Sequence, residues 1–336
     1  MRIPATRVGL WLLLLGLLTA CAPPAPPPVQ QQAYVFGTLV EVSVLDDDRA
    51  RAASALASVL ARFDALHRQL HAWQPSELSR LNAALARGQP VKVTPELAAM
   101  LREAQTLSAQ SGGLFNPAIG RLIALWGFQS DAMPVRVPDA TAIQNGVAAA
   151  PRMADLVIAG NTVSSANPAV QLDLGGYAKG YALDEAVAIL KARGVRHALV
   201  NIGGNVIALG QHGDRPWRVG IQHPRQPGTL ATIDLLDGEA IGTSGDYQRY
   251  FEAGGKRYSH LIDPRTGYPA ASMQSVTVLV SGKRAGTRSD ALSKPLFIDG
   301  PAHLAAHAAA LGVSRYLAVD AAGKIYRSTA MQARLR

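Results

Sequence analysis

Residues 172–181 read Leu-Asp-Leu-Gly-Gly-Tyr-Ala-Lys-Gly-Tyr and predict a strand that turns through two glycines into a helix. The residues before the glycines suit a strand at 170–174, and those after them predict a helix that runs over 177–193. Free N–H groups at the start of a helix beside glycine form a natural cradle for phosphate, to which Lys179 adds a compact positive charge. A tight turn that Asp173 merely caps would explain the same residues, so both interpretations stay open here.

Helices and hairpins surround this stretch without the regular alternation of strand and helix that marks doubly wound proteins. Apolar stripes and capping residues predict helices from about 49 to 70 and over 76–86, 94–112, 116–126, 284–297 and 302–311. Alternating apolar residues and turn signals predict strands at 35–45, 156–159, 162–164, 197–202, 205–209, 217–222, 230–236, 247–251, 256–260 and 275–281, with two short strands at the C-terminus. This mixture predicts an α+β fold with largely antiparallel sheets and flanking helices.

The composition excludes several classes of protein. The chain has 336 residues, 48% of them hydrophobic, and a net charge of +9, so it is long enough for a large core and is not disordered. Its one cysteine, Cys21, rules out a disulfide framework and a cysteine-ligated metal site. The basic residues are scattered and aromatics make up 6%, which does not favour nucleic acid as a partner but suits anionic ligands.

The N-terminus predicts an export signal. Residues 1–20 combine a positive start with a short apolar run, as a signal peptide does, and the Leu-Thr-Ala before Cys21 resembles a lipobox, in which the cysteine is lipidated. An ordinary signal peptide with an incidental cysteine is the alternative. Residues 21–33 would be the lipidated cysteine and a proline-rich extended tether. We therefore expect the folded part to lie on the periplasmic side of a bacterial membrane, inner or outer, held there by lipid.

Motifs of several common enzymes are absent from the sequence. It has no Walker A motif, no G-x-G-x-x-G opening a Rossmann unit, no H-E-x-x-H and no G-x-S-x-G. Kinases, dehydrogenases, zinc peptidases and α/β-hydrolases therefore lose their main support.

Three further polar clusters accompany residues 172–181. They lie at 201–205 (Asn-Ile-Gly-Gly-Asn), at 243–247 with 259–269, and at 289–294 (Ser-Asp-Ala-Leu-Ser-Lys). Within them His260 is a candidate general base and Asp290 a candidate ligand for a hard cation. Taken singly, a structural histidine, a capping aspartate and a plain Gly-Gly bend are the simpler interpretations.

In this order, however, the four clusters resemble the FAD:protein FMN transferase (ApbE) family. Further matches lie at 36–38, 73–82, 113–117 and 125–128, so the resemblance extends over about residues 34–325. It predicts one domain over residues 34–336, with two possible subdomains that meet near residue 150. It implies an ApbE-like, T-fold-related architecture. It also implies an enzyme that uses Mg²⁺, cleaves FAD, joins FMN to a threonine of a partner flavoprotein by a phosphodiester bond, and releases AMP. Acceptors of the family resemble subunits of membrane electron-transfer complexes or periplasmic flavoproteins.

The resemblance also assigns residues to roles. It implies that His260 is the base and that FAD is bound by Phe36, Trp73, Leu114, Phe115, Asn116, Asp173, Lys179 and Leu261. Phe36 stands where the family usually has methionine, and Asn116 replaces the commoner aspartate. The metal positions correspond to the carbonyl of Gly176, the carboxylate of Asp290 and, in place of the usual threonine ligand, Lys294.

Lys294 is the most important difference from the usual residues of the family, because a protonated ammonium group has no lone pair for a metal. Either Lys294 occupies or repels the cation site and neutralises phosphate charge itself, or Ser293 shifts in as an oxygen ligand, helped by a local loosening of the helix at Pro295. Two rival functions also remain: a non-catalytic FAD-binding lipoprotein that serves as a scaffold or carrier, and a pyrophosphatase that converts FAD to FMN and AMP.

Overall fold

The computed structural model describes residues 27–130 and 135–336. The predicted signal peptide, Cys21 and the first part of the tether lie outside these residues. Within them, no helix is long and apolar enough to span a membrane.

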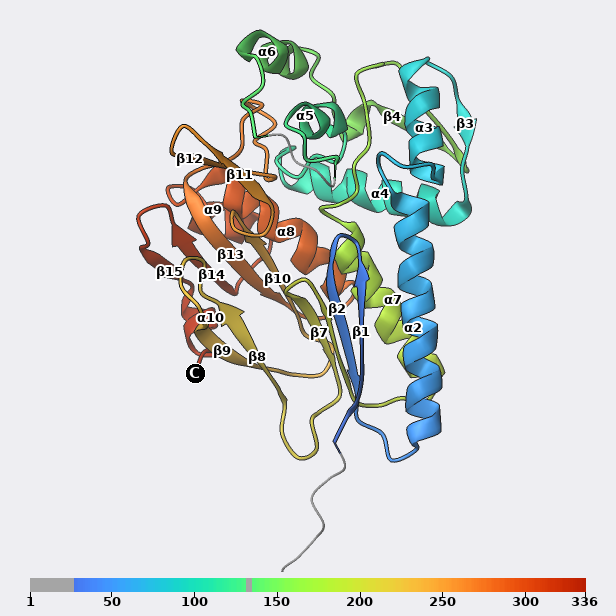
Figure 1. Cartoon of the computed structure of the whole chain (residues 1–336), viewed down its shortest axis with the longest axis vertical. Coiled ribbons are helices and arrows are strands. Elements are labelled where there is room, and N and C mark those ends of the chain that lie inside the picture. The colour runs from blue at the N-terminus through green and yellow to red at the C-terminus, as the bar shows by residue number, and fades with distance from the viewer. Residues whose placement is uncertain (1–26, 131–134) are drawn as a thin grey trace, which may run out of the picture.

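An antiparallel sheet of eight strands forms the centre of the molecule (Figure 1). Its order is β1 (Val29–Val35), β2 (Thr38–Val44), β6 (Ala198–Ile202), β7 (Asn205–Leu209), β10 (Ala240–Gly245), β13 (Met273–Val280), β14 (Tyr316–Asp320) and β15 (Ile325–Arg327). Every neighbouring pair runs antiparallel. The predicted α+β class with antiparallel sheets is thereby confirmed.

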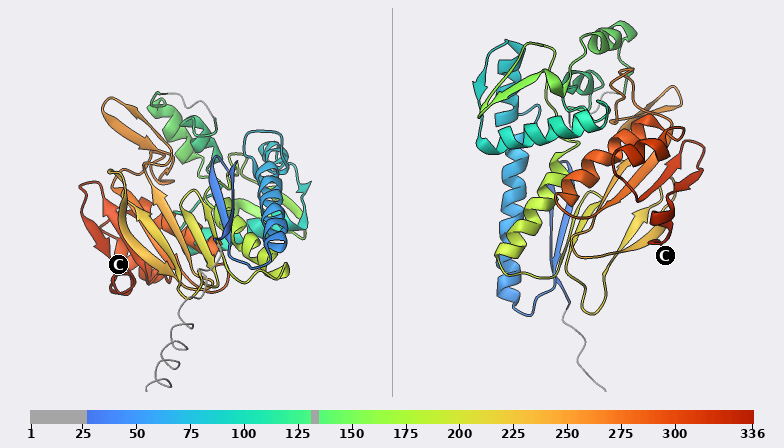
Figure 2. Two further views of the ribbon diagram at one scale, coloured as in Figure 1. Left: turned by 60° about the horizontal axis from the view of Figure 1, so that its bottom comes forward. Right: turned by 180° about the vertical axis from the view of Figure 1, so that it is seen from behind.

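Helices pack on one face of this sheet and enclose the largest hydrophobic core. They are α2 (Arg49–Leu70), α7 (Ala178–Ala192), α8 (Ala285–Asp299) and α9 (Leu304–Ala310). The predicted cap of the first helix is confirmed, since the Asp48 carboxylate accepts the N–H of Arg51 at 3.0 Å. Figure 2 shows α7 and α8 side by side from behind. The core under these helices contains residues from both sides of residue 150, from Val35 to Ala318.

The other face of the sheet carries a smaller core. The hairpin of β8 (Trp217–Gln222) and β9 (Thr229–Leu235) and the short α10 (Thr329–Gln332) contribute to it. Trp217, Ile233 and Met331 bury their side chains there against β7, β10, β13 and β14. Both faces of the sheet are therefore covered, which leaves the ends of its strands for a binding site.

An upper lobe sits above one end of the sheet (Figure 1). It consists of α3 (Glu77–Ala86), β3 (Val91–Lys92), α4 (Pro95–Gln110), α5 (Gly120–Leu125), α6 (Ala140–Ala148), the 3-10 turn η2 (Met153–Asp155), β4 (Leu156–Ala159), β5 (Thr162–Ser165) and the hairpin β11 (Tyr250–Ala253) and β12 (Lys256–Ser259). Trp126, Phe128 and Phe251 form its own small core. The indole N–H of Trp126 donates to the Gly267 carbonyl at 2.7 Å, which ties the lobe to the loop after β12.

Three local predictions differ from the structure. β1 begins at Val29, so residues 29–33 belong to a hairpin with β2 and not to the tether. The strand predicted at 170–174 is reduced to one bridge between Gln171 and Ile119. The helix predicted from Asn116 begins only at Gly120. The sequence patterns also missed β3, α6 and β10.

Candidate active site

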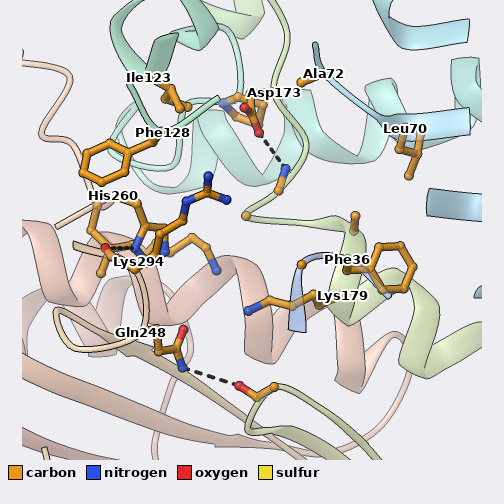
Figure 3. A pocket seen from close by; sticks show the side chains of 18 of the residues that line it. Phe36, Leu70, Ala72, Ile123, Phe128, Asp173, Lys179, Gln248, His260 and Lys294 are labelled. Atoms are coloured by element: carbon orange, nitrogen blue, oxygen red, sulfur yellow. Dashed lines mark hydrogen bonds between the residues drawn. The ribbon is translucent and has the colours of Figure 1, made fainter. Parts of the chain in front are cut away.

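A cavity of about 910 Å³ lies between the upper lobe and the end of the sheet. The turn between β1 and β2, the end of α2, the loop 114–117, the turn 173–179, the loop 260–262 and α8 all contribute to its wall. Figure 3 shows Phe36 on one side of this space and Phe128 with His260 on the other, with Lys179 between them.

The predicted site residues converge on this cavity. Those that line it are Phe36, Trp73, Leu114, Phe115, Asn116, Asp173, Gly176, Lys179, His260, Leu261 and Lys294. Asp290 lies directly behind the wall, with 1% of the residue exposed. Segments that are up to about 260 residues apart in the sequence therefore meet as the resemblance implies.

Aromatic rings form one side of the cavity. Phe36 and Gly37 make the two-residue turn of the β1–β2 hairpin, and Phe36 has a φ of 56°, which is costly for a residue with a bulky side chain. Its ring packs against Phe63 and His67, with centroids 6.1 and 5.8 Å apart. His71 follows, and then Trp73 at 4.4 Å from His71. Strain at a residue whose ring faces a cavity is typical of a ligand contact.

The turn 173–176 has features of both interpretations from the sequence, the turn capped by Asp173 and the phosphate cradle. Asp173 accepts the N–H of Gly175 at 2.9 Å, as a capping residue does, and its other oxygen accepts from Gln129 at 2.8 Å. The same residues line the cavity, and α7 begins directly after them at Ala178. The turn therefore presents the N-terminal end of α7 to any anion in the cavity.

Three cations face this anion-binding end. Lys179, Arg249 and Lys294 line the cavity, whereas Asp173 is the one carboxylate among the residues described along its wall. A second carboxylate, that of Asp290, pairs with Lys294 from behind the wall, so the cations still outnumber the carboxylates. No described residue offers Lys179 a hydrogen-bond acceptor, and burial lowers the pKa of its ammonium group. A half-buried ammonium without a hydrogen-bond partner favours the binding of an anion.

His260 sits between these cations and the aromatic lobe. Its backbone N–H donates to the Arg249 carbonyl at 3.0 Å, and its ring Nδ1 lies 3.2 Å from the same oxygen. Because a carbonyl only accepts, Nδ1 carries the proton of the neutral ring and Nε2 keeps the lone pair. Burial and the positive charge of Lys179 lower the pKa of His260 to about 3. The ring is therefore neutral at physiological pH, as a general base must be.

Asp290 connects the cavity wall to α7. One carboxylate oxygen accepts the N–H of Gly180 at 2.9 Å, and the other lies 2.6 Å from Nζ of Lys294. Nζ also donates to the main-chain carbonyl of Asp290 at 2.7 Å. A Cβ added to Gly176 would lie 2.8 Å from Cε of Lys294, so the lysine stem passes directly over that glycine. Lys294 thus fills the space between the two other residues that the resemblance assigns to the metal.

These residues do not fit a Mg²⁺ site. Mg²⁺ requires oxygen ligands at close range, and here an ammonium group already holds the Asp290 carboxylate. Ser293 does not shift in as a ligand either, because its buried hydroxyl bonds to Ser244 at 2.8 Å and to the Asp290 carbonyl at 2.9 Å. Pro295 does not interrupt α8, which continues to Asp299. Residues 27–130 and 135–336 contain no cluster of three acidic, histidine or cysteine side chains that could hold a metal ion.

The remaining predicted contacts come from the loop that begins at Leu114. The amide N–H of Phe115 donates to Oγ of Ser111 at 3.0 Å, which continues the end of α4. Asn116 accepts the N–H of Ala118 at 3.1 Å and donates to the Pro151 carbonyl at 2.9 Å. Its polar groups therefore brace the loop, which explains why an asparagine stands there.

Sequence reasoning missed several residues of the cavity. The most important is Arg249, whose carbonyl positions His260 and whose guanidinium lies 5.8 Å from the centre of the Trp73 ring. It lies in the predicted strand 247–251 but outside the polar clusters, and no motif marks it. The contact of Lys294 with Asp290 could have been found, because the two are four residues apart on a predicted helix.

Comparisons with known proteins identify the family of the chain. Residues 36–317 match the model of the ApbE family. The chain is 45% identical over 335 residues to a protein of Rhodobacter capsulatus named FAD:protein FMN transferase, an alignment that covers 98% of this chain and 63% of that protein. It is 35% identical to the protein of that name from Klebsiella pneumoniae, over 82% of this chain and 81% of that one.

Solved structures give the same result. The crystal structure of the ApbE protein of Thermotoga maritima superposes with a TM-score of 0.85 at 30% identity, covering 92% of this chain and 99% of the other. Fold, family model and relatives agree, and the chain belongs to the ApbE family.

Proposed function

We propose that this chain is a transferase that moves FMN from FAD to a threonine of a protein acceptor and releases AMP. The observation that carries this proposal is the meeting of one neutral histidine and three cations beside an aromatic wall in a single cavity. The relatives named FAD:protein FMN transferase support it. FAD joins a flat aromatic flavin to a diphosphate, and the cavity offers rings for the one and positive charge for the other.

The reaction is a substitution at phosphorus. The threonine oxygen of the acceptor forms a bond to the phosphorus of the FMN half, while the bond from that phosphorus to the bridging oxygen breaks. AMP leaves with the bridging oxygen and its electron pair. The threonine proton passes to Nε2 of His260, which can return it to solvent or to the leaving phosphate.

The cations serve the same step. Lys179, Lys294 and the N-terminal end of α7 stabilise the charge that moves onto the bridging oxygen. Burial is the main cause of the low pKa of His260, and the positive charge of Lys179 lowers that pKa further. The bound diphosphate offsets this second cause, so the pKa of the ring rises when FAD is present. Substrate binding and activation of the base are therefore coupled.

An in-gel assay tests the proposal. The purified chain is incubated with FAD and a flavoprotein subunit of a membrane electron-transfer complex, and the denatured products are examined for a fluorescent protein band. A covalent band supports the transferase. Free FMN and AMP without a band would indicate the pyrophosphatase instead, and bound but intact FAD would indicate the non-catalytic carrier.

A substitution tests the assigned base. His260→Ala should lower the rate of transfer by about 10²-fold or more, since a positioned general base contributes at least that much. FAD should still bind. The surface variant His303→Ala serves as the control, because His303 is exposed and lies at the start of α9. Transfer at the parent rate in His260→Ala would remove this residue from the mechanism.

We also propose that the chain is exported, lipidated at Cys21 and held on the periplasmic side of a membrane. The support is the lipobox-like sequence before Cys21 and the prolines that follow it. This places the enzyme beside membrane-bound acceptors. Cys21→Ala should move the protein from the membrane fraction to the soluble fraction of the cell, and an unchanged distribution would contradict the proposal.

A further inference from the structure

Lys294 is a cation that the fold holds in one place. Its Nζ donates to both the carboxylate and the main-chain carbonyl of Asp290, at 2.6 and 2.7 Å. Its stem lies against Gly176, where any Cβ would collide with it. Only 14% of the side chain is exposed, and that part belongs to the wall of the cavity. The charge is therefore fixed in position before any ligand enters.

The third N–H of this ammonium group remains for a ligand. An ammonium has three donors, and the described acceptors of Lys294 are the two oxygens of Asp290. Because the residue lines the cavity, a phosphate oxygen there can accept the remaining hydrogen. Asp290 in turn is held by the N–H of Gly180 at the start of α7, which connects this cation to the glycine turn.

The charge of the cavity also suits a diphosphate without a metal. Three cations line its described wall against the carboxylate of Asp173 and that of Asp290 directly behind it, so positive charge is in excess before the negative diphosphate of FAD enters. A divalent cation added to this set would lie close to the ammonium of Lys294, and like charges at such a distance repel. The two cations are therefore alternatives and not partners.

From this geometry we infer that Lys294 supplies the positive charge that the diphosphate of FAD would otherwise receive from Mg²⁺, so that this chain binds and cleaves FAD without a divalent cation. The inference rests on the proposed function, because it assumes that FAD is the substrate. It makes Asp290 the anchor of a lysine in place of the ligand of a metal. It also predicts an enzyme that chelators do not inhibit.

The decisive experiment uses the unaltered chain. FAD is titrated into the purified protein with excess EDTA and again with excess Mg²⁺, and the dissociation constant is measured by calorimetry. If the inference is right, the dissociation constants of FAD in EDTA and in Mg²⁺ agree within about twofold. Transfer of FMN should likewise continue in EDTA.

Variants at one position sharpen the result. Lys294→Thr restores the oxygen that the family usually has, and should lose about tenfold or more in FAD affinity in EDTA but recover with Mg²⁺. Lys294→Met should lose affinity under both conditions. Because it leaves the Asp290 carboxylate buried without a charged partner, the double variant Lys294→Met and Asp290→Asn is measured beside it. Lys324→Met, at an exposed lysine between β14 and β15, is the matched control and should behave like the parent.

The outcomes separate the inference from the proposed function. If the parent chain binds FAD only when Mg²⁺ is present, the inference is wrong while the transferase proposal stands. If Lys294→Met and the double variant bind FAD in EDTA as tightly as the parent does, Lys294 is not the cation and the inference is again wrong. If the parent binds no FAD under either condition, both fail.

Discussion

At both ends of the contact between α7 and α8, an aspartate of one helix caps the first turn of the other helix. At one end, the Asp184 carboxylate of α7 accepts the N–H groups of Gly286 and Thr287 in the first turn of α8, each at 2.9 Å. At the other, the Asp290 carboxylate of α8 accepts the N–H of Gly180 in the first turn of α7. Each helix therefore caps the other, and each aspartate lies beside a cation.

The cations differ in what surrounds them. Arg284, beside Asp184, gives two hydrogen bonds to the Glu103 carboxylate at 2.9 and 2.7 Å. Although burial opposes it, the hydrogen bond from Arg284 keeps the pKa of Glu103 below its usual value. Lys294, beside Asp290, has no second carboxylate among the described residues and faces the cavity instead. At the Arg284 end, the protein itself supplies a second carboxylate for the cation, and the result is a structural ion pair. At the Lys294 end, no second carboxylate is present among the described residues, so the cation can bind an anionic substrate.

The largest effect is expected where the two helices cross. A Cβ on Gly180 would lie 2.4 Å from the Gly286 carbonyl oxygen and 2.6 Å from Cβ of Asp290. Because the first of these is main chain, Gly180→Ala should lower the free energy of unfolding by about 3 kcal/mol. Denaturant titration measures this. Ala188→Ser, on the exposed face of α7, is the control, and an equal loss in both would show that the crossing is not tightly packed.

The next largest effect distinguishes the Asp184 end of the helix contact from the Asp290 end. Asp184→Asn removes the charge that caps α8 and should lower the free energy of unfolding by about 2 kcal/mol. Since Asp184 does not line the cavity, the dissociation constant of FAD should stay within about twofold of the parent value. Asp290→Asn, its counterpart, should weaken FAD binding as well, because Lys294 loses its anchor. Calorimetry with FAD that finds the same loss of affinity in both variants would refute the distinction between the two ends.

Local signals in the sequence were enough for most helices and hairpins. The cap at Asp48 and the Thr94-Pro95 start both appear in the structure, where Oγ1 of Thr94 accepts the N–H of Leu97 at 3.2 Å. Such caps depend on neighbours within a few residues, so their pattern is visible in one sequence.

The strand predicted at 170–174 failed because its partners are distant. The main chain of Leu172 is paired by the side-chain amide of Asn82, at 2.7 and 2.9 Å, and not by a neighbouring strand. Similarly, Gly120 donates to the Gln171 carbonyl at 2.7 Å, which delays the start of α5. Both contacts join residues about 50 to 90 positions apart, which periodicity cannot reveal.

The site shows the same division. Lys179 and His260 stand within polar clusters and could be predicted, whereas Arg249 acts through its carbonyl and its position, which only the folded chain defines. The main-chain role places no requirement on residue type, and the guanidinium that lines the cavity belongs to one of many scattered basic residues. Neither leaves a mark in a single sequence.

A smaller effect should appear with pH at the cavity end, where the half-buried His260 lies among cations. The pKa of His260 is about 3 in the folded chain against an ordinary value of 6.5, so between these values only the unfolded chain binds the proton. Stability is therefore lost as the pH falls through this range. In His260→Gln that contribution is absent. The difference in unfolding free energy between pH 7 and about pH 5.5 should be smaller in the variant by about 1 kcal/mol. Identical pH dependence would mean that the histidine is not held neutral.

The smallest effect concerns Ser293, which lies between Asp290 and Lys294. Its hydroxyl is wholly buried and bonds to Ser244 on β10, so Ser293→Ala should lower the free energy of unfolding by about 0.5 kcal/mol. FAD affinity should stay unchanged, with or without Mg²⁺. A loss of affinity that appears only in Mg²⁺ would instead make Ser293 a metal ligand. The cavity end of α8 would then hold a second cation beside Lys294, and its contrast with the Arg284 end would disappear.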